Sequence, residues 1–436
     1  MKRSISSEPE DESDDSSKGP KRAKTDIDEW PASKVSMELA RTFIKNAAAS
    51  NSRVVICPDK DADGLSAGTI MLRTLVTLGL DSSLISVHLL SKGTGIHSAE
   101  ETDKIVKLEP KHIIVLDQGS RGGPPILADV PTLIIDHHYS FEFPEEATIC
   151  TAAYSPPIAT SALLTYCLCE PLHEELKSRI NYVAVIGTVG DLSSTVKWVE
   201  PFPPYLGEVM RDQGKKNVAD AVGLLNAPRR SHIYNTIEAW NSLQASSNTS
   251  DIIHHSTNPH LVKLLEARDE VAVENERHGR NAPLFSLDKR TACLIIDSGC
   301  QVHPLIATKW ASFLKSKDLM VVMCANTGYM EGKVHFSCRV PKFRRVDDGT
   351  ANAVDLQAVL KEYASRNPDL ERRLIEGGSF AKGHKEASGG VLDTEVWEEL
   401  YKTMEIGKPI KKTKEVPKKQ ANVLTNYFKS PVKKKV

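Results

Sequence analysis

The chain has 436 residues, enough for two or three domains, and its 56 lysines and arginines nearly balance its 57 aspartates and glutamates. It contains no apolar run of about 18 residues, which excludes a membrane-spanning helix. The serine-rich start lacks the apolar core of a signal peptide, so we expect a soluble, intracellular protein. The eight cysteines show no paired C-x-x-C spacing. This spacing predicts reduced thiols and argues against a zinc site or a disulfide framework.

The first 34 residues are polar, with an acidic block at residues 8–15 and a basic cluster at residues 21–24. Such a segment cannot bury enough apolar surface to fold alone, so we expect residues 1–34 to be disordered. The basic cluster is either a nuclear import signal or part of a solvated tail.

Residues 54–67, VVICPDKDADGLSA, begin with a β-branched run and continue into three alternating acids, Asp59, Asp61 and Asp63. In an extended segment these side chains face the same way, and three unpaired carboxylates there are costly. Mg²⁺ or Mn²⁺, which prefers oxygen ligands, would remove that cost. Gly64 is expected to allow a tight turn into an amphipathic helix at residues 65–78. The alternative is an acidic surface loop.

Three further apolar runs each end in an acid. They are residues 113–116 with Asp117, residues 133–135 with Asp136-His137-His138, and residues 182–189 with Asp191. Continuous apolar runs of this kind predict buried strands of a parallel sheet. Ligands of open α/β sheets lie outside the carboxyl ends of the strands, so we expect these acids and histidines to converge on one crevice. His137 adds an imidazole ligand that suits Mn²⁺.

Four ordered motifs resemble those of the DHH phosphoesterase family, and the first has the form most similar to the RecJ-like nucleases. They are Asp59-x-Asp61-x-Asp63-Gly64, Asp117-x-Gly119, Asp136-His137-His138 and Gly187-Thr188-x-x-Asp191. The resemblance implies a two-metal phosphoesterase that uses Mn²⁺ or Mg²⁺. The ligands it implies are Asp59, Asp61, Asp63, Asp117, His137 and Asp191. It implies catalytic roles for Asp59, Asp136 and His138, with Asp59 as a ligand or a base, and His138 as a hydrogen-bond donor to phosphate or as a support for the ligands.

Residues 201–286 predict a helical connector that follows the DHH domain at residues 35–200. Within it, residues 225–230, LNAPRR, are similar to a segment of the RecJ-like enzymes. The resemblance aligns Arg230 with a family arginine, and a guanidinium binds phosphate in bidentate fashion. The alternative is an exposed basic turn.

Residues 287–400 predict a second, smaller α/β domain, with strands at residues 292–296 and 319–324 and a half-buried strand at 333–340. Ser337 and Arg339 resemble a strand motif of the DHH-associated domain, and residues 383–390 resemble its glycine-rich signature, with Lys382 in place of a usual glycine. This resemblance implies that Ser337, Arg339, Gly383 and His384 bind substrate phosphate. The predicted fold class is therefore two α/β domains joined by a helical connector, with disordered tails.

Residues 401–436 are strongly basic, and we expect them to be disordered. Leu424, Tyr427 and Phe428 have the spacing of one helical turn that inserts apolar anchors into a pocket. This segment looks like the clamp-binding peptide of proteins that dock on PCNA, although Ala421 stands at the usual glutamine position. The alternative is a tail that contacts nucleic acid non-specifically.

The sequence is compatible with three functions. The first is a nuclear, RecJ-like single-strand exonuclease acting in DNA repair, which the basic tail and the clamp-like peptide favour. The second is a phosphoesterase for short oligonucleotides, cyclic dinucleotides or polyphosphate, since no oligonucleotide-binding domain is evident. The third is a non-catalytic replication scaffold, against which the intact acid set argues. The expected partners are single-stranded nucleic acid and PCNA, with no membrane, and the chain is expected to be a monomer or weak dimer.

Overall fold

The computed structural model describes residues 29–345 and 354–408. The predicted clamp-binding residues Leu424, Tyr427 and Phe428 and the basic cluster at residues 21–24 lie outside the described residues. The chain divides into two compact units. Among the described residues, the first comprises residues 29–277 and 298–302, and the second comprises residues 278–297, 303–345 and 354–408.

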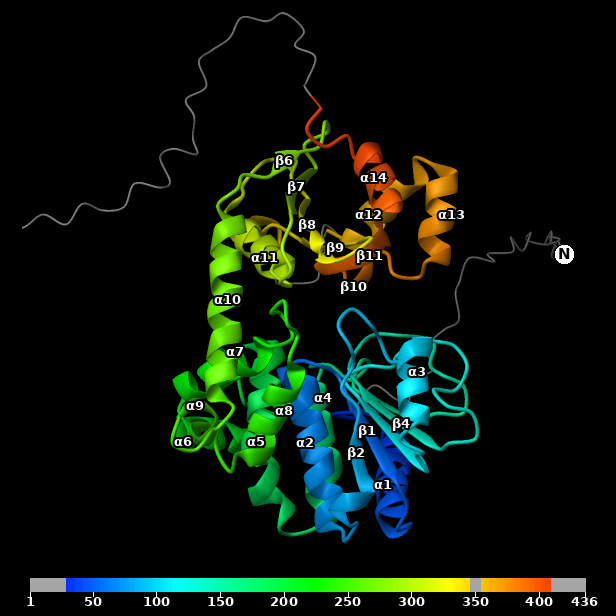
Figure 1. Cartoon of the computed structure of the whole chain (residues 1–436), viewed down its shortest axis with the longest axis vertical. Helices are drawn as coiled ribbons and strands as arrows, with labels where there is room; N and C mark the ends of the chain where they lie inside the picture. The colour runs from blue at the N-terminus through cyan, green and yellow to red at the C-terminus, as the bar shows by residue number, and fades with distance from the viewer. Residues whose placement is uncertain (1–28, 346–353, 409–436) are drawn as a thin grey trace, which may run out of the picture. The chain divides into compact units, whose positions relative to one another are not determined.

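The first unit is built on a five-stranded parallel sheet with the strand order β2-β1-β3-β4-β5. Figure 1 labels β1, β2 and β4 of this sheet. Its strands are β1 (Val54–Pro58), β2 (Ile85–Val87), β3 (His112–Leu116), β4 (Thr132–Asp136) and β5 (Thr148–Thr151). Every residue of β1 and β4 is buried, as expected for strands that are covered on both faces. The strands predicted before the first three acidic motifs are confirmed.

Helices cover this sheet on both faces. Alternate residues of a strand point to opposite faces, and each face packs in a hydrophobic core of its own. Val54 and Ile56 pack with α1, α2, α4 and α5, whereas Val55 and Cys57 pack with Ile105 of α3. The helices of this unit are α1 (Lys34–Ala49), α2 (Ala62–Thr77), α3 (Ala99–Val106), α4 (Ser161–Cys169), α5 (Leu176–Leu192), α6 (Pro204–Gln213), α7 (Lys215–Asn226), α8 (Thr236–Ala245) and α9 (Thr249–Ile253), followed by α10 (Leu261–Gly279), whose last two residues belong to the second unit.

Two local predictions in this unit are wrong. Residues 182–189 belong to α5 and not to a strand. An apolar run does not separate a buried strand from a buried helix, and α5 is buried along this stretch because it packs against α2, α4 and α7. The three acids of the first motif also do not share one extended segment. β1 ends at Pro58, Asp61 caps α2, and Asp63 lies in the first turn of that helix.

The second unit contains a six-stranded mixed sheet with the order β10-β11-β9-β8-β7-β6, in which only β7 and β8 are parallel. Its strands are β6 (Leu284–Phe285), β7 (Thr291–Ile296), β8 (Val321–Met330), β9 (Lys333–Arg339), β10 (Lys382–His384) and β11 (Ala387–Asp393). Its helices are α11 (His303–Phe313), α12 (Leu356–Ser365), α13 (Pro368–Glu376) and α14 (Thr394–Thr403). The predicted class of two α/β domains is confirmed.

β9 is buried on both faces rather than half-buried as predicted, because α11 lies against one face and α14 packs in the core on the other. The glycine-rich segment forms strands, and its glycines permit close strand packing. A Cβ at Gly389 would lie 2.4 Å from the carbonyl oxygen of Phe336, and one at Gly390 would lie 2.4 Å from that of Ser379. Lys382 is accommodated in β10, opposite Gly389.

The cysteines are free thiols, as predicted, and all but the partly exposed Cys167 are buried. Among the described helices, none is both long enough and apolar enough to cross a membrane.

Candidate metal centre

The predicted metal ligands converge at the carboxyl edge of the parallel sheet in the first unit. Asp59 follows β1, Asp61 and Asp63 begin α2, Asp117 follows β3, His137 follows β4, and Asp191 lies near the end of α5. Ligand atoms lie within 4.8 Å of one another in three groups. These are Asp59 with Asp61 and Asp117, Asp63 with His137 and Asp191, and Asp117 with His137 and His138. Because Asp117 and His137 each belong to two groups, the ligand set forms one continuous cluster.

The cluster concentrates negative charge in a site that is buried at Asp63 and Asp117 and exposed at Asp191. Burial, together with the Asp191 and Asp61 carboxylates, raises the pKa of Asp63 well above its usual value. Burial, together with repulsion from the Asp63 carboxylate and its acidic neighbours, raises the pKa of Asp117 well above its usual value. Burial and Asp61 raise the pKa of Asp191 to about 6. Divalent cations would relieve this repulsion, so the donor set fits Mn²⁺ or Mg²⁺.

The first turn of α4 holds two of these acids. The backbone N–H groups of Ser161 and Ala162 donate to the two carboxylate oxygens of Asp63, at 2.8 and 3.0 Å. The Ser161 hydroxyl donates to Oδ1 of Asp117 at 2.8 Å. Thr160 caps the helix by accepting from the N–H of Leu163. The family motifs did not predict a role for Ser161. Its contacts with Asp63 and Asp117 follow from the position of the first turn of α4 beside the carboxyl edge of the sheet.

Arg229 lies closer to the cluster than the sequence predicted. Its Nη2 is 3.5 Å from Oδ2 of Asp61, and its Nε donates to Oδ1 of Asn226 at 3.1 Å. The same Asn226 oxygen accepts from the N–H of Ala62, the first residue of α2. Burial raises the pKa of Asp61, but Arg229, the Gly64 N–H and His138 outweigh it, so the net shift is downward. Burial and Arg229 lower the pKa of Arg230, the predicted phosphate ligand, to about 9, against the attraction of Asp61.

Asp136 is placed to position His138. Its Oδ1 accepts from the backbone N–H groups of His137 and His138 and lies 2.7 Å from Nδ1 of His138, while Oδ2 accepts from the N–H of Ser120. Burial alone would lower the pKa of His138, but the Asp136 carboxylate raises it to about 9. The imidazole is therefore protonated at neutral pH, and its side chain is half exposed. His137 lies 3.4 Å from Asp117 and 3.3 Å from Asp191.

Two motif glycines permit close packing around the cluster. A Cβ at Gly64 would lie 2.6 Å from the carbonyl oxygen of Asp59, so the first turn of α2 can lie against the end of β1 only with glycine there. A Cβ at Gly187 would lie 2.3 Å from Cβ of Ala162 and 3.0 Å from Oδ1 of Asp63. Gly187 therefore lets α5 approach α2 and α4 closely enough to bring Asp191 to the cluster.

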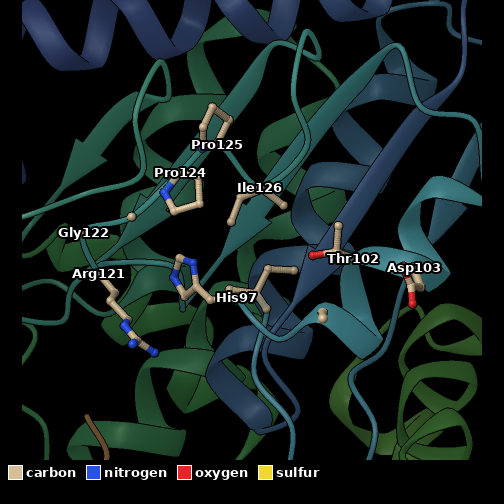
Figure 2. A pocket seen from close by; sticks show the side chains of 11 residues that line it. His97, Thr102, Asp103, Arg121, Gly122, Pro124, Pro125 and Ile126 are labelled. Atoms are coloured by element: carbon tan, nitrogen blue, oxygen red, sulfur yellow. The ribbon is translucent and has the colours of Figure 1, made fainter. Parts of the chain in front are cut away.

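A cavity of about 410 Å³ lies between the loops that follow β2 and β3 (Figure 2). Its apolar wall consists of Pro124, Pro125 and Ile126, and His97 and Arg121 are among its polar residues. Nε2 of His97 is buried without a hydrogen-bond partner among the described residues. Burial, with the charge of Arg121, lowers the pKa of His97, so its imidazole is neutral at pH 7.

The predicted phosphate-binding residues of the second unit lie on β9 and β10, two strands of one sheet with β11 between them. Arg339 donates through Nη1 to Oγ of Ser337 at 2.7 Å and through Nε to Oγ1 of Thr308 at 3.2 Å. Gly383 has a left-handed φ of 103° and pairs with Ser388. The backbone of His384 lies in β10, and its side chain is outside the described part of the chain. Burial lowers the pKa of His303 to about 3, with a contribution from Arg339.

Comparisons with known proteins agree with this arrangement. Residues 53–188 match the DHH family, N-terminal domain. A curated relative, the single-stranded-DNA-specific exonuclease RecJ of Thermus thermophilus, is 24% identical over 176 residues, which are 36% of this chain and 25% of that protein. The chain thus matches about a quarter of the length of this relative.

Solved structures share the fold at low sequence identity. RecJ of Thermus thermophilus in complex with Mn²⁺ has a TM-score of 0.59 at 17% identity, covering 85% of this chain and 54% of that chain. An exonuclease RecJ bound to manganese has a TM-score of 0.58 at 17% identity, covering 85% and 93%. A DHH domain described as a member of the s1p family of ribosomal proteins has a TM-score of 0.57 at 13% identity, covering 86% and 92%.

The matched segment includes all the proposed metal ligands except Asp191, which lies three residues beyond it. The similarity to the DHH family is thus a similarity of residues 53–188.

Proposed function

We propose that this chain is a metal-dependent phosphodiesterase that hydrolyses single-stranded nucleic acid from one end. The observation that carries the proposal is the convergence of five carboxylates and His137 into one cluster at the carboxyl edge of the sheet, buried at Asp63 and Asp117 and open to solvent at Asp191. The similarity to RecJ supports nucleic acid as the substrate. The ligands are Asp59, Asp61, Asp63, Asp117, His137 and Asp191, and they hold two Mn²⁺ or Mg²⁺ ions.

When bound, two such ions lower the pKa of a water molecule and offset charge on the reacting phosphate. The chain itself supplies orientation and a proton donor. Asp136 engages Nδ1 of His138, which leaves Nε2 of His138 as the nitrogen that would donate to a phosphoryl or leaving oxygen. Asp136 is thus a positioning residue. Asp59, whose pKa burial raises, is a ligand or accepts a proton from water.

Residues of both units are proposed to bind the non-reacting phosphates. Arg229 and Arg230 lie beside Asp61 in the first unit. In the second unit Ser337, Arg339, Gly383 and His384 take this role, and the bonds from Arg339 to Ser337 and Thr308 hold its guanidinium in a fixed orientation.

A second candidate is a phosphoesterase for small substrates such as short oligonucleotides, cyclic dinucleotides or polyphosphate. The 410 Å³ cavity favours it, because a pocket that combines an apolar wall with Arg121 suits a compact ligand (Figure 2). A nuclear location and binding to PCNA through the C-terminal tail remain proposals that rest on the sequence.

The test is digestion of end-labelled single-stranded DNA and RNA of graded length, with polyphosphate and a cyclic dinucleotide in parallel. The protein is stripped of metal with a chelator and reloaded with Mn²⁺. Stepwise shortening of long strands is the expected result. Cleavage of short substrates alone would favour the second candidate. His137→Ala is expected to lower the rate by more than about 100-fold, whereas His255→Ala, on an exposed loop, should leave it unchanged. Equal rates for the wild type and His137→Ala would contradict the proposal.

A further inference from the structure

An exposed aromatic cluster follows directly after the histidines of the metal centre. Tyr139 is 58% exposed and Phe141 is 79% exposed. Their ring centroids lie 4.9 Å apart, and the Tyr139 ring lies 5.3 Å from that of Tyr154. The three rings line a surface hollow of about 580 Å³ with Ala153, Pro156 and Ile158. Large apolar side chains grouped on a surface in this way indicate a binding site.

Hydrogen bonds within the loop and from Tyr154 hold these rings in place. The hydroxyl of Tyr154 donates to the carbonyl oxygen of Ser140, and the hydroxyl of Ser140 donates to the carbonyl oxygen of Glu142. The Glu142 N–H donates back to the Ser140 hydroxyl. Tyr139 and Phe141 therefore stand on either side of a residue that is itself anchored, so the rings are presented in a fixed arrangement before any ligand binds.

The cluster is continuous with the site of the proposed chemistry. Phe141 is three residues after His138, so their Cα atoms are at most about 11 Å apart. The bases of nucleotides next to a phosphate bound beside His138 can therefore reach the aromatic cluster. The loop and its flank, residues 139–158, contain three glutamates and no lysine or arginine. This surface therefore does not attract phosphates, and what it presents to a ligand is the face and edge of aromatic rings.

We propose that Tyr139, Phe141 and Tyr154 form a stacking platform for the unpaired bases of the strand whose phosphate occupies the metal centre. The inference rests on the proposed function and extends it to a base-binding subsite. Base–aromatic stacking is sequence-tolerant, because every base has a π-face. It also requires unpaired bases, since the faces of paired bases are covered within a duplex. The platform thus supplies preference for single strands without any contact to a base edge.

The test compares the affinity of the Mn²⁺-loaded protein for two uncleavable phosphorothioate oligomers of equal length, a thymidine oligomer and an abasic one. Phe141→Ala is expected to weaken binding of the thymidine oligomer by roughly 5- to 100-fold. It should leave the affinity for the abasic oligomer unchanged. Phe141→Trp should restore the thymidine affinity. Phe313→Ala, at another exposed phenylalanine in the second unit, is the matched control.

The salt dependence gives a second readout. Stacking releases no counterions, so the effect of Phe141→Ala should be the same at low and high salt, unlike the loss of a phosphate contact. Equal weakening for both oligomers, or a loss that disappears at high salt, would overturn the platform while leaving the proposed function intact. A dimeric wild type that becomes monomeric in Phe141→Ala with unchanged affinity for nucleic acid would assign the cluster to a second copy of the chain. A wild type that neither binds nor cleaves any oligomer would remove the proposed function and the platform together.

Discussion

The close approach of α5 to α2 and α4 is the packing feature on which the metal centre depends most directly, and Gly187→Ala tests it. The added Cβ would lie 2.3 Å from Cβ of Ala162, 2.9 Å from Cβ of Ser66 and 3.0 Å from Oδ1 of Asp63. Real Cβ atoms do not approach other atoms this closely, so the helices must separate. Overpacking of this kind costs about 1–3 kcal/mol. At roughly 2–4 °C per kcal/mol, the melting temperature should fall by about 2–12 °C.

Gly223→Ala is the matched control, because Gly223 lies within α7 and a Cβ there meets no atom within 4 Å. Alanine in an exposed helix interior is expected to stabilise by about 0.5–1 kcal/mol. The assay is thermal unfolding followed by circular dichroism, first in chelator and then with Mn²⁺. Gly187→Ala should also gain less from Mn²⁺ than the wild type, because Asp63 and Asp191 are moved apart. A Gly187→Ala variant as stable as Gly223→Ala would refute the reasoning.

Three other predictions concern single contacts. Asp136→Asn should return the pKa of His138 from about 9 towards its usual value of about 6.5 in the metal-free protein, which imidazole NMR titration measures. Because the pKa of His138 is raised in the folded state, the stability that the His138–Asp136 pair contributes is complete below about pH 6.5 and is lost as the pH rises to about 9. The wild type should therefore lose more stability between these pH values than Asp136→Asn. Asn226→Ala should lower the free energy of unfolding by about 1–3 kcal/mol in urea, because the buried N–H of Ala62 loses its acceptor; an unchanged midpoint would contradict this. Glu101→Gln should lower the free energy of unfolding by about 1–3 kcal/mol at pH 7, since this fully buried carboxylate accepts hydrogen bonds from His88, Thr94 and Lys104. Burial raises the pKa of Glu101, but these hydrogen bonds outweigh burial and the net shift is downward. The difference in stability from the wild type should therefore shrink as the pH falls below about 4.5.

The strands and the ligand types were accessible from the sequence, because apolar runs followed by acids are local patterns. Residues 113–116 and 133–135 are the strands that the pattern predicts, and the acids after them reach one edge because parallel strands share a direction. The run at residues 182–189 was misassigned, since burial on all sides removes the periodicity that separates helix from strand.

The supporting contacts were not accessible, because they depend on how distant segments meet. Ser161 reaches Asp117 from a helix that begins 44 residues later, and Asn226 reaches Ala62 across 164 residues. The resemblance assigned Arg230, whereas the residue beside it, Arg229, makes the ion pair with Asp61. The distinction depends on the direction of two adjacent side chains at the end of α7, which spacing alone does not specify.

Metal binding by the cluster of acids can be measured by calorimetric titration of the chelator-stripped protein with Mn²⁺. We expect saturable binding of two ions per chain, with release of protons, because the pKa values of Asp63, Asp117 and Asp191 are raised in the metal-free protein. His137→Ala should bind fewer ions or bind them more weakly. Absence of saturable binding, or identical binding by the wild type and His137→Ala, would contradict the account.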